Sequence, residues 1–400
     1  MNRQPYCKPP QWWEPKMNAG MVRLSRLFRR RRLRKHQRIQ SIETPGIERL
    51  QQAVQSGKGV LLIANHSAHY DSEALYAATD SINMPLFFMT AWQVFGMATS
   101  LQRWALQRVG CFSVDREGND RQAFKQGVQI LQDEPYPLVI FPEGDIYHTT
   151  DRVTPFREGA AAIALSAARR SERPIVIQPC GIKFWYLDDP TAQLQQLLTT
   201  LEERVLLRPL PEQSLKQRVL RLGEAVLALK ELDYVGATQK GKVPERIANL
   251  SEQVLSRLEQ KYVQNGVAAN TPERVKTVRQ EIIKQLESEE ASTNGRQREL
   301  GEDMDDLFFV MQLYSHPGDY LSGQPSIERI AETLDKIEED LFQLDLPSVR
   351  GRRRVVIQFG EPIEVPRGDK RREAVAELTG AMHRSVQDIL DQLNAQATTC

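Results

Sequence analysis

The sequence predicts an α/β protein with a mostly parallel sheet flanked by helices and interrupted by a large α-helical insertion. Three observations lead to this fold class. Short apolar runs alternate with helical stretches between residues 44 and 189, which is typical of βαβ units. Residues 190–348 are charged and helical, with few strand signals. Strand character returns near residue 354, so the helical stretch is far longer than an ordinary connection and is predicted to be an insertion.

The expected elements follow in order along the chain. Apolar runs predict strands at 60–64, 86–89, 138–141, 175–177 and 354–359. Helical patterns predict helices at 71–78, 121–132, 159–169 and 370–393. These elements define a basic N-terminal arm over 1–44, an α/β domain over 45–189 and 350–400, and a helical insertion over 190–349.

Two apolar stripes within the insertion predict packed helices. Their members are spaced three or four residues apart: Ile327, Ile330, Leu334, Ile337, Leu341 and Leu344 in one, and Ile247, Leu250, Val254 and Leu258 in the other. We expect the first stripe to pack within the insertion, with dimerisation as the alternative.

Charge is unevenly distributed along the chain. The net charge is +1, but residues 16–42 hold ten Lys or Arg and no Asp or Glu, which leaves 43 basic against 52 acidic residues elsewhere. Met17 to Gln40 fits a basic amphipathic helix, which predicts binding to an anionic membrane surface. The alternative is a solvated, partly disordered arm. No base-stacking module accompanies the basic segment, so nucleic acid is not the expected partner.

From composition we expect a cytoplasmic protein that lies peripheral to a membrane, without a transmembrane helix. The four cysteines, at positions 7, 111, 180 and 400, form no C-x-x-C pair, so neither a zinc site nor a disulfide framework is expected. The longest apolar runs are strand-sized, whereas a membrane span needs ~20 residues. The N-terminus lacks the apolar core of a signal peptide.

His66 and Asp71 lie five residues apart, just past the apolar run at 60–64. On a continuous helix this offset is about 140° of rotation, so the two side chains would not share a face. They can meet if His66 ends a strand and Asp71 begins a helix, where an acidic residue is favoured. The carboxylate would then bond one ring nitrogen and leave the other as a base. The alternative is an unconnected surface histidine.

A second polar string, Phe141-Pro142-Glu143-Gly144, follows the strand predicted at 138–141. Its backbone N–H groups and flexible glycine suit an anion, although an ordinary turn is the alternative. Arg116 closes a third string and suits a phosphate, with a surface pair to Asp115 as the alternative. Because reactive groups of open α/β sheets gather at the carboxyl ends of strands, we expect one site.

Taken in order, these strings resemble the four blocks of the glycerolipid (lysophosphatidate-type, 1-acylglycerol-3-phosphate) acyltransferase family. The blocks are Asn65-His66-x4-Asp71, Gly110-x-Phe112-x3-Arg116, Phe141-Pro142-Glu143-Gly144 and Pro174-Ile175-Val176-Ile177-x-Pro179. Residues 155–161 and 359–363 resemble two further family segments, so the resemblance covers 50–190 and 350–395.

The resemblance implies an O-acyltransferase of phospholipid biosynthesis. His66 would be the general base that removes a proton from the acceptor hydroxyl, and Asp71 would orient it. Arg116, Glu143 and Gly144 would hold a lysophospholipid or glycerolipid acceptor, typically through its phosphate. The donor would be an acyl thioester of coenzyme A or acyl carrier protein, with no further cofactor, no metal and no covalent acyl-enzyme.

One departure from the family pattern bears on the acceptor. Asp145 and Ile146 follow Gly144, where the family usually continues with Thr-Arg, so a cation is lost and an anion gained. At ~4 Å and an effective dielectric constant of about 20, such a charge is worth about 4 kcal/mol. We therefore keep a non-phosphorylated hydroxylated lipid as an alternative acceptor, and a catalytically idle lipid-binding scaffold as an alternative role. His69 and His148 are expected to be local hydrogen-bonding or surface groups.

Overall fold

The computed structural model describes residues 10–116, 120–263, 270–287, 294–344, 346–368, 371 and 373–397 of the chain. These residues divide into an α/β unit, within 10–190 and 348–400, and a helical unit, within 191–347. The sequence predicts divisions at 189/190 and 349/350. Cys7 and Cys400 lie outside the described residues, and Cys111 and Cys180 are buried free thiols.

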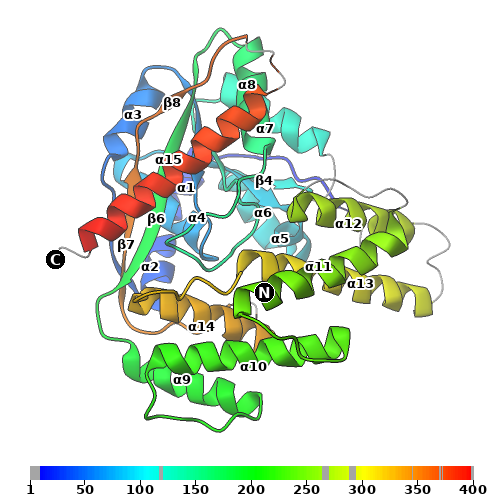
Figure 1. Cartoon of the computed structure of the whole chain (residues 1–400). Helices are drawn as coiled ribbons and strands as arrows, with labels where there is room; N and C mark the ends of the chain where they lie inside the picture. Colours follow the sequence, from blue (N-terminus) through cyan, green and yellow to red (C-terminus); the bar gives the residue numbers. More distant parts are fainter. Residues whose placement is uncertain are drawn as a thin grey trace. The chain divides into compact units, whose positions relative to one another are not determined.

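The α/β unit is built on a mixed sheet with mostly parallel strands (Figure 1). Its strands are β1 (Ile39–Glu43), β2 (Gly59–Ala64), β3 (Phe87–Ala91), β4 (Cys111–Val114), β5 (Leu138–Ile140), β6 (Ile175–Tyr186), β7 (Arg353–Phe359) and β8 (Ile363–Glu364). They lie in the order β1-β7-β6-β2-β5-β3-β4, and β8 pairs with β6. From β6 to β4 all neighbours are parallel, whereas β7 and β8 run antiparallel to β6. The predicted fold class is confirmed.

The central strand β2 is apolar throughout because helices cover both faces of the sheet. Every residue of Gly59–Ala64 is buried, as is typical of a parallel strand between two helical layers. Leu62 and Ala64 belong to the core on one face, and Leu61 and Ile63 to the core on the other. Because successive side chains of the strand point to opposite faces of the sheet, they belong to two separate cores.

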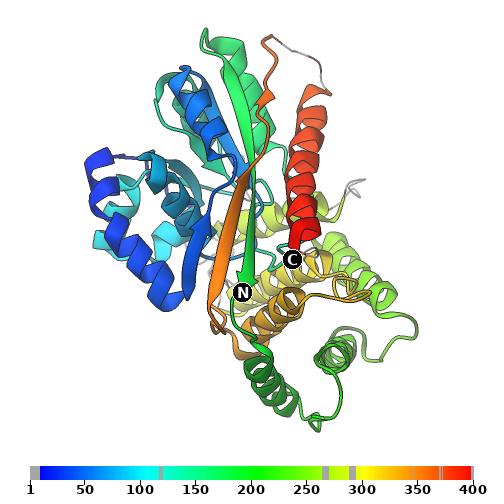
Figure 2. The same cartoon turned by 90° about the vertical axis from the view of Figure 1, so that its left-hand side faces the viewer.

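Helices of the α/β unit form the two covering layers. They are α1 (Ala19–Leu24), α2 (Arg26–His36), α3 (Ile47–Gln55), α4 (Asp71–Thr79), α5 (Trp92–Met97), α6 (Ser100–Arg108), α7 (Arg121–Asp133), α8 (Gly159–Arg170) and α15 (Ala374–Ala397), with a 3-10 turn at Asp80–Ile82. Buried residues of α2, α3 and α4 join one core, and those of α7, α8 and α15 join the other. Figure 2 shows α2 and α15 on opposite sides of β6.

The basic N-terminal segment differs from the single helix predicted over 17–40. Asn18 caps α1 by accepting the N–H of Met21 at 2.9 Å, and the helix ends at Leu24. Ser25 separates α1 from α2, and its hydroxyl donates to the Val22 carbonyl at 3.0 Å, an alternative to continuous helix bonding. Residues 39–43 form β1 beside β7, so the arm predicted to extend to residue 44 ends before the sheet begins.

The helical unit contains α9 (Thr191–Arg204), α10 (Leu215–Val235), α11 (Val243–Tyr262), α12 (Thr271–Glu287), α13 (Asn294–Ser315) and α14 (Ile327–Phe342). The stripe predicted on α11 is buried, and it packs against α12 and α13 around Val278, Ile282 and Leu307. On α14, Ile330 and Leu334 are buried and the helix contacts α9 and α10, so it packs within the helical unit as predicted. The last member of the predicted stripe, Leu344, lies beyond the helix and is exposed. Among the described helices, none combines the length and the apolar character that crossing a bilayer requires.

Candidate active site

The polar strings that follow β2 and β5 meet at one edge of the sheet. These strands are parallel neighbours, with Leu61 opposite Leu138 and Ile63 opposite Ile140. Because both strands end within one residue of this register, the segments that follow them emerge side by side. The convergence expected from the sequence is found.

His66 and Asp71 form a hydrogen-bonded pair at this edge. Nδ1 of His66 lies 3.0 Å from Oδ2 of Asp71, which is the first residue of α4 and is fully buried. The same oxygen accepts the N–H groups of Ser67 and Ala68, each at 2.8 Å. The carboxylate therefore fixes both the turn into α4 and the imidazole. Because Nδ1 faces Asp71, Nε2 is the nitrogen available to a substrate.

His66 is also held through its ring face and its backbone. Its ring stacks on Phe141, with 4.1 Å between centroids and 16° between planes. Its N–H donates to Oε1 of Glu143 at 2.6 Å, and its carbonyl accepts the N–H of Tyr147 at 3.3 Å. The side chain keeps 19% of its surface exposed, so a rigidly oriented imidazole remains open to a ligand.

Glu143 is buried and its carboxylate joins His66 to the loop that precedes α8. Oε2 of Glu143 accepts the N–H of Thr154 at 2.8 Å and the Thr154 hydroxyl at 2.5 Å, while Oε1 accepts His66. Burial raises the pKa of Glu143 to about 7, against these hydrogen bonds, which favour the charged form. Both oxygens are bonded within the protein, and the expected contact of Glu143 with the acceptor stays a prediction.

Gly144 adopts a conformation that side chains disfavour. Its φ is 80°, and its N–H donates to the Phe141 carbonyl at 3.0 Å to close a tight turn. A Cβ atom at this position would lie 2.5 Å from Nε of Arg157. Both the backbone and the neighbouring guanidinium therefore require glycine here.

Arg116 contacts both this turn and the carboxylate of Asp145. Its Nη1 donates to the Gly144 carbonyl at 2.6 Å and lies 3.6 Å from Oδ1 of Asp145. Arg157 donates to the Arg116 carbonyl at 3.2 Å. Burial disfavours the charge on Asp145, but Arg116, the Ile146 N–H and Arg157 outweigh it and lower the pKa of Asp145. Asp145 therefore lies next to Arg116, the side chain that the sequence predicts to bind a phosphate.

Two residues of the site carry roles that the sequence did not indicate. Asn65 donates to the Ile182 carbonyl at 3.0 Å and accepts the Ile182 N–H at 2.7 Å, which ties the end of β2 to β6. Thr154 holds Glu143 from a loop eleven residues further along the chain. Asn65 begins the string that contains His66 and Asp71, so its position was a signal, but nothing in the local sequence distinguishes Thr154.

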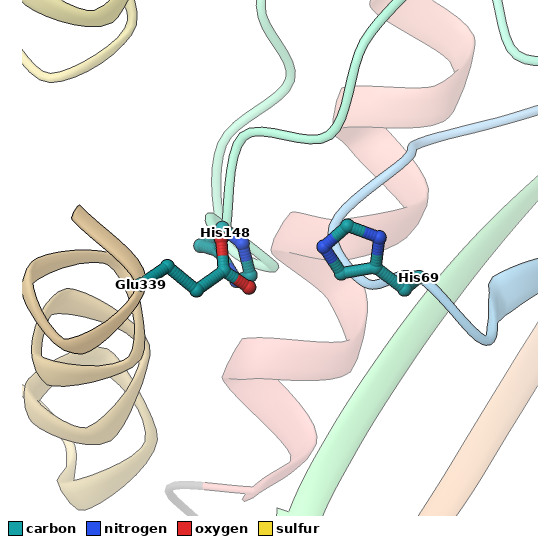
Figure 3. A group of neighbouring side chains, drawn as sticks. All are labelled: His69, His148 and Glu339. Carbon is teal, nitrogen blue, oxygen red and sulfur yellow. The ribbon is translucent and has the colours of Figure 1, made fainter. Parts of the chain in front are cut away.

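His69 and His148 lie beside one another near the site (Figure 3). Their ring centroids are 5.8 Å apart and the planes are tilted by 55°. His69 comes from the loop before α4, and His148 is buried in the loop after β5 with a φ of 52°. The local role expected for them stays a prediction.

A paired histidine and aspartate at the edge of a parallel sheet suit base-catalysed transfer. A family model described as Acyltransferase matches residues 41–183. The matched region runs from β1 into β6 and contains each candidate site residue: His66, Asp71, Arg116, Glu143 and Gly144. The match supports acyl transfer in general, while β7 and the helical unit lie outside it. No curated protein matches the chain.

Proposed function

We propose that the protein is an O-acyltransferase that moves a fatty acyl group from a thioester of coenzyme A or acyl carrier protein to a lipid hydroxyl. The observation that carries this proposal is the His66–Asp71 pair within an acyltransferase domain. The acceptor we propose is a lysophospholipid or another glycerolipid, as the motif order suggests.

In the proposed reaction, Nε2 of His66 takes the proton of the acceptor hydroxyl as its oxygen attacks the thioester carbonyl. The C–O bond forms, the C–S bond breaks, and the proton on His66 passes to the departing thiolate. Asp71 holds Nδ1 and stabilises the imidazolium between the two transfers. The proposal needs no acyl-enzyme, and the buried Cys180 suits none, because burial raises the pKa of its thiol.

The alternative acceptor, a non-phosphorylated hydroxylated lipid, draws support from Asp145. Its carboxylate lies 3.6 Å from the arginine that would bind a phosphate, so a phosphate there would meet both a cation and an anion. Acylation rates of the purified enzyme with lysophosphatidate and with monoacylglycerol decide between the two. Preference for lysophosphatidate would reject the neutral acceptor.

The test of the proposed chemistry is His66→Ala, with His36→Ala on α2 as the matched control. Removal of the base is expected to lower acyl transfer by about 10²–10⁴-fold, while the control keeps its activity. Circular dichroism checks that both variants fold. Full activity of His66→Ala would refute the proposal, and an inactive wild-type enzyme that still binds lipid would favour the idle scaffold.

A further inference from the structure

The helix pair α1–α2 exposes large apolar side chains on its outer face. Leu24, Leu27 and Phe28 are between 67% and 82% exposed. The inner face fixes the pair to the α/β unit, because Leu33 is buried and Arg29 bonds Asp80 at 2.7 Å. The outer apolar residues therefore belong to an anchored helix, and their exposure is a property of the folded unit.

Cations share that outer face. At 100° per residue, Leu27, Phe28, Arg31, Arg34 and Lys35 fall within about 120° of the circumference of α2. The three cations are exposed, and the described residues provide no acidic partner for them. Apolar side chains alternating with unpaired cations on one helix face are typical of binding to an anionic bilayer.

A second helix pair, α5–α6, adds apolar residues beside the first. Met97, Leu101 and Trp104 are between 46% and 73% exposed, and the guanidinium of Arg108 lies 5.8 Å from the Trp104 ring centroid. Tryptophan with a neighbouring cation suits the level of lipid headgroups. Thus α5–α6 carries the same combination of side chains as α1–α2.

Backbone hydrogen bonds join the two pairs. The N–H of Asn18, which caps α1, donates to the Arg108 carbonyl at 2.9 Å, and the N–H of Lys16 donates to the Gln107 carbonyl at 3.0 Å. Figure 2 shows α1–α2, in dark blue, on the same side of the sheet as the cyan helices α5–α6. We call the exposed residues of this outer surface the docking face: Leu24, Leu27, Phe28, Arg31, Arg34, Lys35, Met97, Leu101 and Trp104.

The docking face adjoins the edge of the sheet that carries His66. α5 begins directly after β3, a parallel strand that ends at the same edge as β2 and β5. The other pair reaches this edge too: Arg353 donates both to the Gln37 carbonyl at the end of α2 and to the Tyr70 hydroxyl just before α4. A surface bound to this face would lie close to the candidate active site.

We propose that α1–α2 and α5–α6 together dock the protein on an anionic lipid bilayer and bring the His66 edge to the lipid surface. The charge of the docking face indicates that its partner is an anionic bilayer. Its apolar residues are bordered by unpaired arginines and a lysine, which complement acidic lipid headgroups. The inference goes beyond the acyl-transfer reaction, since it concerns where the folded protein binds and can be measured without turnover.

Sedimentation of the full chain with vesicles tests this docking. We expect binding to vesicles of equal phosphatidylglycerol and phosphatidylcholine, and much weaker binding to pure phosphatidylcholine. Arg31→Ser with Arg34→Ser is expected to weaken binding about 30-fold. Leu101→Ser with Trp104→Ser is expected to weaken it at least about tenfold, which separates α5–α6 from a purely electrostatic arm.

Leu206→Ser in the helical unit is the matched control, because Leu206 is highly exposed and lies outside the docking face. It should leave vesicle binding unchanged, and circular dichroism confirms that each variant folds. Equal binding to both kinds of vesicle, or unchanged binding of the α5–α6 variant, would overturn the proposal. Binding to duplex DNA without binding to vesicles would overturn it as well and assign the face to nucleic acid.

Discussion

Replacing Glu143 with Gln is expected to change how the stability of the α/β unit depends on pH. Burial raises the pKa of Glu143 from its ordinary value of 4.5 to about 7. Between these values the folded protein keeps the proton that the unfolded chain has lost. Folding therefore binds a proton in this window, and the free energy of unfolding falls as pH rises from about 4.5 to about 7.

The size of this effect follows from the pKa difference. The step from 4.5 to about 7 corresponds to about 3 kcal/mol of unfolding free energy, at about 1.4 kcal/mol per pKa unit. Glutamine is neutral throughout, so its variant lacks this contribution. The variant should gain about 2–3 kcal/mol relative to wild type between pH 5 and pH 8. At pH 5 the Glu143→Gln variant is expected to be less stable than wild type. Both oxygens of Glu143 accept N–H groups, from His66 and Thr154, whereas the NH₂ group of glutamine cannot accept a hydrogen bond.

Urea unfolding followed by tryptophan fluorescence measures this difference. All five tryptophans, at positions 12, 13, 92, 104 and 185, lie in the α/β unit, so the signal reports on that unit. Glu134→Gln, at the exposed end of α7, is the control for the same chemical change away from the site. A stability difference between wild type and Glu143→Gln that stays constant from pH 5 to pH 8 would refute the reasoning.

Three further substitutions test the site. Asp71→Asn should lower kcat by about 10³-fold or more, because the amide no longer stabilises the imidazolium; a kcat within tenfold of wild type would contradict the assigned pair. Asp145→Asn should raise the rate with lysophosphatidate relative to monoacylglycerol by roughly tenfold, since Arg116 loses its anion and the partly exposed charge acts through solvent. An unchanged substrate ratio would remove Asp145 from specificity. Gly144→Ala should destabilise the α/β unit by about 1–3 kcal/mol in urea unfolding, owing to its φ of 80° and the contact with Arg157; equal stability would show that the turn relaxes.

Elements with a strong local signal were predictable from the sequence. The apolar run at 60–64 and the amphipathic pattern at 121–132 became β2 and α7 with bounds within one residue. β1 gave no such signal, because only Ile39 is buried in an edge strand next to a basic segment. β6 runs to Tyr186, well beyond the predicted 177, because pairing with β7 stabilises its second half. Pairing of this kind depends on residues far away in the chain.

By itself, the sequence determined that His66 and Asp71 could pair, because a strand end followed by a helix start brings residues five apart together. Only the tertiary structure decided the contacts of Glu143 with His66, 77 residues away, and of Arg116 with Asp145. It likewise decided which side of the basic helices faces outward. The physical reason is that local spacing fixes geometry over a few residues, whereas the adjacency of β2, β5 and β3 fixes which distant loops meet.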